Sequence, residues 1–323
     1  MTNLETRPLE ARHLPAAAAL CRCEIAYLPF SEAILQDRIL DDPDFDPDLS
    51  PTVWQGERLV GLACGAPPSE ELQTVGGVKL FAVASEMRRQ GIATRLFDQI
   101  EDRLAGLGAG ESVAIIAGNN RFMQGLDLRY TEALCFLEAR GYERAGDGMD
   151  MDVDLRNTPL DTSEKEEELA RDHGLRVRRL TMDDYQQAWD YVAREFEYPS
   201  ALATDPVGRR GAYLATSGLK LDPPTLWMAE KDGEFCGFAV TDVAAPERLG
   251  PMGVSPEVRK LGVGTVLLKR ALVDLRARGV ETGVIYGAGP YAFYARTVNA
   301  TINAVFWRLC KPLPKTSCSQ CFT

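Results

Sequence analysis

The sequence predicts a protein of the α+β class (mixed α/β), made of two tandem domains that share one fold. We expect each domain to be a mixed, mostly antiparallel sheet flanked by helices. Three observations lead to this prediction. The chain has 323 residues, about twice the usual length of a domain. Sequence features recur in the same order at an offset of 171 residues. In each half, hairpin patterns come first and a strand–helix–strand pattern comes later.

The first half begins with a short strand and two helices, and continues with a hairpin whose turn at Gly56-Glu57 has suitable chemistry. Its expected elements, in order, are a strand near 4–9, helices near 13–27 and 31–41, strands near 51–56, 58–66 and 76–84, a helix near 91–106, a strand at 112–117, a helix at 130–140 and strands near 142–155.

The second half repeats this order, with a hairpin turn at Lys231-Asp-Gly233. Its expected elements are a strand at 175–181, helices near 182–197 and 205–217, strands at 225–230, 234–244 and 247–254, a helix at 261–278, a strand at 281–286, a short helix at 290–298 and strands to about 310.

The two halves are joined by an acidic segment that contains Glu164-Lys-Glu-Glu-Glu168 and few apolar positions. We expect a first domain at residues 1–156, a solvated linker at 157–174 with at most one exposed helical turn, and a second domain at 175–323. A functional acidic tail is the alternative interpretation of the linker.

Composition excludes several classes of function. Hydrophobic residues make up 45% of the chain and charged residues 26%, as in an ordinary soluble globular protein. The formal net charge of −11 argues against nucleic acid or an anionic membrane as a partner. The histidines are only His13 and His173, so we expect no metal site and no histidine base.

The rest of the composition suggests a cytoplasmic protein. Eight cysteines in a chain of this length do not form a disulfide scaffold, and most lie in apolar patterns. Cys318 and Cys321 form a CxxC pair near the end of the chain, but no second pair or histidine accompanies them. No signal peptide is visible, and no apolar run reaches the length of a membrane span.

The strongest repeat is a strand, a turn and a glycine-containing segment that opens a helix. Phe81-Ala-Val83 is followed after four residues by Arg88-Arg-Gln-Gly-Ile-Ala93, and Met252-Gly-Val254 is followed after four residues by Arg259-Lys-Leu-Gly-Val-Gly264. The first turn of a helix carries free N–H groups and a partial positive charge, and glycine lets a phosphate approach closely. This arrangement suits a diphosphate. The alternative is a tight turn that only caps a helix.

Two other phosphate-binding motifs do not fit. A dinucleotide fingerprint needs its glycines directly after the strand, whereas here several residues separate the two. A P-loop needs Gly-Lys-Ser/Thr, which neither segment contains.

The pattern Arg-x-x-Gly-x-Gly/Ala after a strand that ends in Val instead resembles the acetyl-CoA motif of the GNAT superfamily of N-acetyltransferases. The resemblance covers nearly the whole chain and implies that both segments bind coenzyme A. The implied coenzyme-binding residues are Met252, Val254, Arg259, Lys260, Leu261, Gly262, Val263, Gly264 and Thr265 in the second copy, and Phe81, Val83, Arg88, Arg89, Gln90, Gly91, Ile92, Ala93, Thr94 and Asn119 in the first.

A later helix carries the second family feature. The segment Tyr291-Ala-Phe-Tyr294 of the second copy corresponds to Leu134-Cys-Phe-Leu137 of the first. In the family, the tyrosine hydroxyl lies near the thioester sulfur and can protonate the leaving thiolate. A phenol is protonated at neutral pH, as a general acid must be, whereas leucine has no proton to give. The resemblance therefore implies that the second copy is catalytic, and that the first copy binds acetyl-CoA without turnover or is structural. A core tyrosine is the alternative for Tyr294.

The resemblance also implies a reaction. A small primary amine would attack the thioester directly, while backbone amides around Met252 to Val254, freed by a separation of the strands, polarise the carbonyl. Glu247 and Asp242 are candidates for the base, and either can instead be a plain surface carboxylate. An acyl-CoA-binding sensor or scaffold and a protein-lysine acetyltransferase remain alternatives. The chain can be a monomer or a homodimer.

Two segments suggest a subgroup. Residues 289–300 and 125–134 look like the corresponding parts of tandem bacterial enzymes that acetylate glucosamine or glucosaminides. Mycothiol synthase is similar in layout. An amino sugar is therefore the favoured acceptor.

Overall fold

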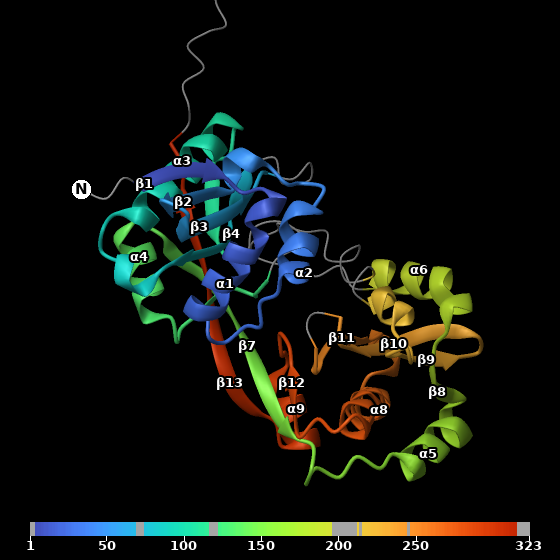
Figure 1. Cartoon of the computed structure of the whole chain (residues 1–323). Helices are drawn as coiled ribbons and strands as arrows, with labels where there is room; N and C mark the ends of the chain where they lie inside the picture. The colour runs from blue at the N-terminus through green and yellow to red at the C-terminus, as the bar shows by residue number, and fades with distance from the viewer. Residues whose placement is uncertain are drawn as a thin grey trace, which may run out of the picture. The chain divides into compact units, whose positions relative to one another are not determined.

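The computed structural model describes residues 4–68, 74–115, 122–195, 212, 215–243 and 246–314. The predicted fold class is confirmed, because helices flank sheets whose strands are mostly antiparallel (Figure 1). Two pairs of described strands run parallel, β4 with β5 and β11 with β12. Each of these pairs lies beside one of the repeated glycine segments in the sequence.

The first compact unit comprises residues 1–147, 200–205 and 306–323. Its sheet has the strand order β1-β2-β3-β4-β5-β13, and β6 also pairs with β13. Its strands are β1 (Leu4–Pro8), β2 (Pro51–Gln55), β3 (Arg58–Ala66), β4 (Val75–Val83), β5 (Glu111–Ala114), β6 (Leu126–Asp127), the first part of β7 (Glu143–Asp154) and the last part of β13 (Thr301–Pro312). Its helices are α1 (Leu14–Glu24), α2 (Glu32–Leu35), a π-helix (Gln36–Leu40), α3 (Ile92–Gly106) and α4 (Thr131–Ala139), with 3-10 turns at Ala11–His13, Pro47–Leu49 and Ser85–Met87.

The second compact unit comprises residues 148–199 and 206–305. Its strand order is β7-β12-β11-β10-β9-β8. Besides the last part of β7 and the first part of β13, its strands are β8 (Leu175–Arg179), β9 (Leu226–Lys231), β10 (Glu234–Thr241), β11 (Arg248–Val254) and β12 (Thr282–Ile285). Its helices are α5 (Ser163–His173), α6 (Tyr185–Glu195), α8 (Val263–Ala277) and α9 (Tyr291–Val298), with 3-10 turns at Met182–Asp184, Gly218–Lys220 and Pro256–Val258.

The units divide the chain differently from the expected boundaries at 156 and 175. The last part of β13 belongs to the first unit because Leu309 to Pro312 pair with β5. Residues from 148 onward belong to the second unit because Met151 to Asp154 pair with β12. Each sheet therefore contains a strand segment from the other half of the sequence.

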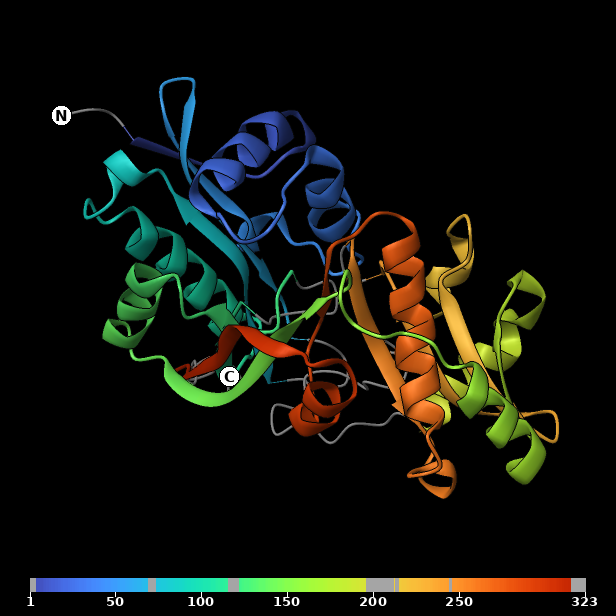
Figure 2. The same cartoon turned by 90° about the horizontal axis from the view of Figure 1, so that it is seen from below.

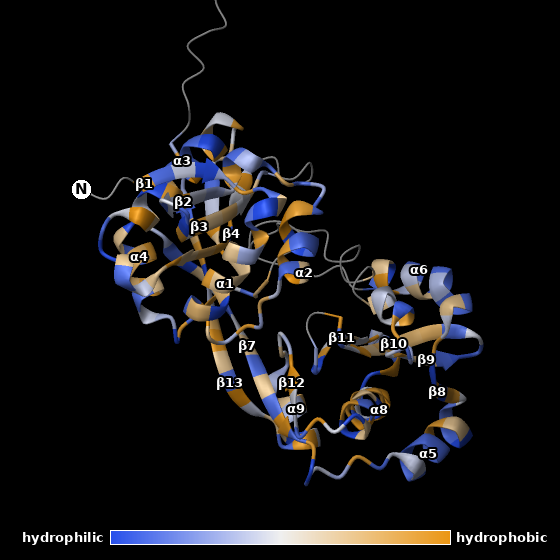
Figure 3. Cartoon of the chain, viewed as in Figure 1, coloured by the Kyte–Doolittle hydropathy of each residue, from blue (hydrophilic) through white to orange (hydrophobic). Residues whose placement is uncertain are grey.

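Amphipathic helices cover both faces of each sheet. In the first unit, α1 packs on one face of β3 and β4 and α3 packs on the other (Figure 2). In the second unit, α8 covers one face of β9 and β10, and α6 contributes to a separate apolar cluster on the opposite face. Leu267, Ala271 and Leu275 of α8 are fully buried. In Figure 3, α8 carries many hydrophobic residues, whereas most of α5 has the colour of hydrophilic ones.

The acidic linker, which we expected to be solvated with one exposed helical turn at most, contains a longer helix that packs on the second unit. Residues Ser163–His173 form the 11-residue helix α5, which ends at Gly174 in the left-handed conformation. Its one long apolar residue, Leu169, is only 1% exposed and belongs to the core of the second unit. Glu166 forms a bidentate ion pair with Arg270 of α8, with distances of 2.6 and 2.7 Å. A single leucine and one ion pair thus dock a helix whose composition is otherwise hydrophilic.

Within the described residues, no helix is both long enough and apolar enough to cross a membrane.

The strand segment at the end of β13 provides a test of this domain organisation. We expect Leu309→Asp to destabilise the first unit by about 3 kcal/mol or more, because it places a charge at a position that is 1% exposed. Hydrogen exchange should show faster exchange in β3 to β5 while β9 and β10 keep their protection. Loss of protection confined to the second unit would contradict the assignment of this segment.

Candidate functional site

The two glycine segments have the same backbone conformation. In each, a 3-10 turn leads to an extended arginine, Arg88 or Arg259. The next residue is left-handed, with φ of 61° at Arg89 and 68° at Lys260. The helices α3 and α8 then begin after left-handed N-cap glycines, Gly91 and Gly262, with φ of 79° and 104°. Two segments of different sequence thus share one conformation.

The first turns of α3 and α8 suit an anion. Neither helix has a side chain that caps its N-terminus, and neither has an acidic residue in its first turn. The first N–H groups of each helix therefore have no intrahelical acceptor and carry the positive end of the helix dipole. A Cβ built on Gly91 would meet no atom within 4 Å, so the start of α3 is open to a ligand.

The parallel strands beside each segment separate after a short register. Strand β4 pairs with β5 only through Val75 to Val78. Strand β11 pairs with β12 only through Arg248 and Leu249, so Met252 to Val254 have a registered neighbour, β10, on one side only. Among the described residues, the backbone groups next to each glycine segment are therefore not paired with the neighbouring parallel strand. This is the separation of strands that we expected around Met252 to Val254.

In the first unit, this separation opens into a cavity of about 880 Å³. The end of β4, the start of α3, the helix α4 and the residues after α1 line it, and its wall is mostly apolar. Eight of the ten coenzyme-binding residues expected in the first copy line the cavity: Phe81, Val83, Arg88, Arg89, Gly91, Ile92, Ala93 and Thr94. Gln90 does not, and its side chain bonds to the carbonyl of Glu86 at 3.3 Å. Asn119 lies outside the described residues, as do Cys318 and Cys321.

The charges at the two segments differ. Arg88 and Arg259 each donate from Nε to the last carbonyl of the preceding strand, at 3.3 and 3.0 Å. Arg88 also forms ion pairs with Glu24 at 2.6 Å and Glu132 at 2.5 Å. Within the described part of the chain, Arg259 has no such carboxylate partner. Two carboxylates thus compensate the charge of the arginine in the first unit, whereas none of the described carboxylates does so in the second.

Tyr294 of α9 and Leu137 of α4, which the sequence comparison pairs, have similar but not identical places in their helices. Tyr294 lies five residues before the left-handed Asn299, and Leu137 lies four residues before the left-handed Gly141. Both are buried, and both are preceded by a half-buried phenylalanine, Phe136 or Phe293. The carbonyls of Leu137 and Tyr294 each accept a bond from the residue after the left-handed turn, at 3.0 and 3.4 Å. The ring of Phe293 lies 3.5 Å from a Cβ built on Gly264. The residue that precedes Tyr294 therefore contacts the first turn of α8.

The two carboxylates proposed as bases lie elsewhere. Asp242 and Glu247 belong to the turn between β10 and β11, and both have positive φ. Asp242 accepts the N–H of Glu247 at 2.8 Å and pairs with Arg278 at 2.6 Å. The seven residues of β11, about 20 Å of strand, separate this turn from the glycine segment. The structure does not bring either carboxylate beside that segment.

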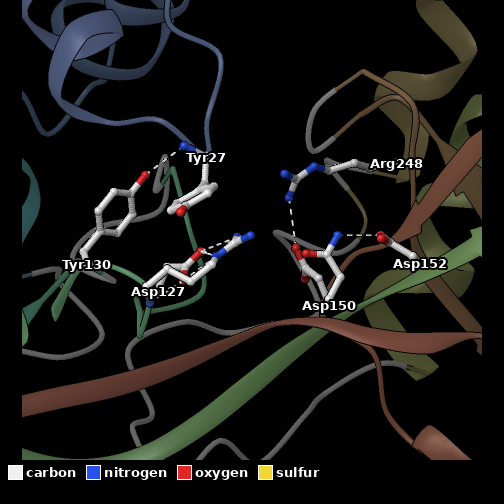
Figure 4. Close-up of polar contacts among 8 residues, drawn as sticks. Tyr27, Asp127, Tyr130, Asp150, Asp152 and Arg248 are labelled. Atoms are coloured by element: carbon white, nitrogen blue, oxygen red, sulfur yellow. Dashed lines mark hydrogen bonds and ion pairs between the residues drawn. The ribbon is translucent and has the colours of Figure 1, made fainter.

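Our sequence reasoning missed a polar cluster of the second unit. Strand β7 carries carboxylates at alternate positions, and Asp150, which is 2% exposed, accepts bonds from Arg248 at 3.1 Å and from the N–H of Gly287 at 2.9 Å. Asp152 accepts a bond from Asn303 (Figure 4). Arg248 and Gly287 lie where β11 and β12 begin to separate. Alternating aspartates in a strand were the available signal.

A polar cluster of the first unit lines the cavity. Arg129 holds the buried Asp127 through Nε and Nη2, and its guanidinium lies 3.7 Å from the centre of the Tyr27 ring. The hydroxyl of Tyr130 accepts the N–H of Tyr27 at 3.0 Å (Figure 4). Burial raises the pKa of the Tyr130 phenol. Tyr27, Arg129 and Tyr130 thus add polar groups to a mostly apolar wall that also carries the charged Glu24, Arg88, Arg89 and Glu132.

A family model matches the chain twice. The model of the acetyltransferase (GNAT) family covers residues 18–126 and 176–296. Each match contains one glycine segment and the strand before it.

Known proteins resemble the chain either over a short stretch of sequence or over nearly the whole fold at low sequence identity. A mycothiol acetyltransferase of Streptomyces coelicolor is 38% identical over 68 residues, which are 20% of this chain and 22% of that protein. A glucosamine N-acetyltransferase region of a fungal multi-domain β-N-acetylglucosaminidase has a TM-score of 0.74 at 14% identity, covering 96% of this chain and 38% of the other. A tandem GNAT protein of the clavulanic acid biosynthesis pathway has a TM-score of 0.67 at 17% identity, covering 98% and 100%. These two structures share the fold.

The thiols provide a test of the cavity. We expect Cys135, which is exposed and lines the cavity, and the exposed Cys23 to react with iodoacetamide first at pH 8. Burial raises the pKa of Cys64 to about 12 and that of Cys236 to about 11, and only the thiolate reacts. At pH 8 we therefore expect Cys236 to react about a hundredfold, and Cys64 about a thousandfold, more slowly than a thiol of ordinary pKa. Mass spectrometry of peptides over time measures this order. Equal labelling of Cys64 and Cys135 would contradict the structure.

Proposed function

The chain belongs to the GNAT family of acetyltransferases, and we propose that it transfers the acetyl group of acetyl-CoA to a small primary amine, with the second domain as the catalytic one. The observation that carries this proposal is the doubled glycine segment, accompanied by a tyrosine at the helix position in one copy only. The solved relative described as a glucosamine N-acetyltransferase region supports an amino sugar as the acceptor.

The residues of the second domain fit the coenzyme in two places. The N–H groups at the start of α8, with Arg259 and Lys260 beside them, suit the diphosphate. Backbone groups of Met252 to Val254, which have no partner in β12, suit the amides of the pantetheine arm. When bound, acetyl-CoA supplies an acetyl group that its thioester activates. The chain binds and orients this group, and the backbone N–H groups polarise the carbonyl.

Tyr294 is the proposed general acid. As the amine forms its bond to carbon and the carbon–sulfur bond breaks, the Tyr294 hydroxyl gives a proton to the departing sulfur, and the amine loses a proton. Glu247 and Asp242 remain the sequence-based candidates for accepting the amine proton. Their turn lies at the end of β11 that is far from the glycine segment, so they would accept this proton only through a chain of water molecules.

The first domain is proposed to bind coenzyme A without turnover. Its cavity includes the expected glycine segment, but Leu137 replaces the proposed acid. This cavity is also the observation that favours the second candidate function, an acyl-CoA sensor or scaffold. The two functions differ in whether the second domain releases free coenzyme A in the presence of an amine.

Replacement of the proposed acid tests the catalytic domain. We expect Tyr294→Phe to lower turnover by about 10²–10⁴, because the ring still packs but no proton can be donated. Tyr291→Phe on the same helix is the matched control, since Tyr291 is 37% exposed and should tolerate the change. Release of free thiol with amino sugars measures both variants. A loss below threefold in Tyr294→Phe would remove Tyr294 from the mechanism.

Thiol protection tests the first domain. We expect coenzyme A to slow alkylation of Cys135, which lines the cavity, while Cys23, which is exposed but does not line it, reacts at an unchanged rate. The readout is the rate of labelling with and without coenzyme A. If both cysteines keep their rates at saturating coenzyme A, the first domain does not bind it at this cavity.

A further inference from the structure

The helix α5 brings a lysine to the glycine segment of the second unit. Lys165 and Leu169 are four residues apart and share one face of α5. Leu169 is buried in the core that also contains Val263 and Val266 of α8. Because Leu169 and the Glu166–Arg270 ion pair fix α5 on α8, Lys165 is directed toward the start of α8.

The side chain of Lys165 lies directly over Gly262. A Cβ built on Gly262 would overlap Cε of Lys165 and would lie 3.2 Å from Nζ. The corresponding glycine of the first unit, Gly91, has no atom within 4 Å of such a Cβ. The two segments share a backbone conformation, but only the second has a cation placed over its N-cap glycine.

We propose that Lys165 binds the diphosphate of coenzyme A in the second domain, together with the N–H groups of the first turn of α8. This inference rests on the proposed function of that domain. Arg259 and Lys260 precede Gly262 in the segment, so Lys165 adds a third positive charge from a separate element. Lys165 is the one lysine of the acidic segment at residues 157–174, so this segment contributes a residue to the proposed binding site.

The present partner of Lys165 does not prevent this role. Nζ pairs with Glu168 at 2.5 Å, but the two side chains are 33% and 40% exposed. Ion pairs between side chains of this exposure are weak, because water screens them and both side chains must be held in place. A diphosphate carries more than one negative charge and is held by several N–H groups, so it can displace Glu168.

Calorimetric titration of the full chain with coenzyme A tests the proposal. The parent variant is Ala93→Glu, which puts a carboxylate in the first turn of α3 and thereby disfavours a phosphate in the first domain. In this background, we expect Lys165→Ala to raise the dissociation constant about tenfold and Lys165→Arg to restore it to within about threefold. Lys269→Ala is the matched control, because it removes the same charge from α8 at a position away from Gly262.

The outcomes separate the role of Lys165 from the proposed function. An equal loss of affinity for coenzyme A and for 3′-dephospho-coenzyme A supports binding of the diphosphate. A loss for coenzyme A alone would assign Lys165 to the 3′-phosphate and overturn the proposal. Unchanged or tighter binding in Lys165→Ala would overturn it too, and tighter binding would identify Lys165 as a side chain that obstructs the segment. If the Ala93→Glu parent binds no coenzyme A, the proposed function of the second domain fails together with this role.

Discussion

The separation of two parallel strands is the constraint on which each candidate site depends. A parallel strand normally pairs along its length, and a backbone group left without a partner carries a free-energy cost when it is buried. Here β4 leaves β5 after Val78, and β11 leaves β12 after Leu249. The backbone beyond these points can bind a ligand that has amides of its own. In both units, the same strand leads through a left-handed glycine to the unpaired N–H groups of a helix.

The two units share this backbone conformation and differ in the side chains around it. The first unit has a large, mostly apolar cavity, an arginine compensated by two carboxylates, and Leu137 where an acid would be needed. The second unit has Tyr294 at that position, and Arg259 has no carboxylate partner in the described part of the chain. These differences support a division in which one domain catalyses and the other binds. They lie in side chains of α1, α4, α5 and α9, while the backbone conformation of the two glycine segments is the same.

Local patterns predicted the local features well. The order of most described helices and strands follows from periodicity and from turn residues. Each glycine segment leads into an amphipathic helix as the pattern predicted, while the left-handed N-cap conformation of Gly91 and Gly262 became visible only in the structure. The sequence also placed Tyr294 and Leu137 in short helices, each directly after a phenylalanine, and the structure has both residues in such helices. Such features depend on residues that are close in sequence.

Features that depend on distant residues were not predictable in the same way. The pairing of Leu309 with Ala114 joins segments almost 200 residues apart, and no local pattern specifies the partner of a strand. The docking of α5 rests on Leu169 and on the Glu166–Arg270 pair, so its composition alone suggested a solvated linker. The sequence did not choose between Glu247 and Asp242 as the base, and the distance of both from the glycine segment became clear only with the bounds of β11.

Hydrogen exchange of the full chain with and without saturating coenzyme A tests most directly whether the glycine segment before α8 holds the diphosphate. Slower exchange at the amides of residues 260–265, with unchanged exchange at 272–277 in the last turns of the same helix, is the result that the account predicts. Identical exchange at residues 260–265 in both samples would contradict it.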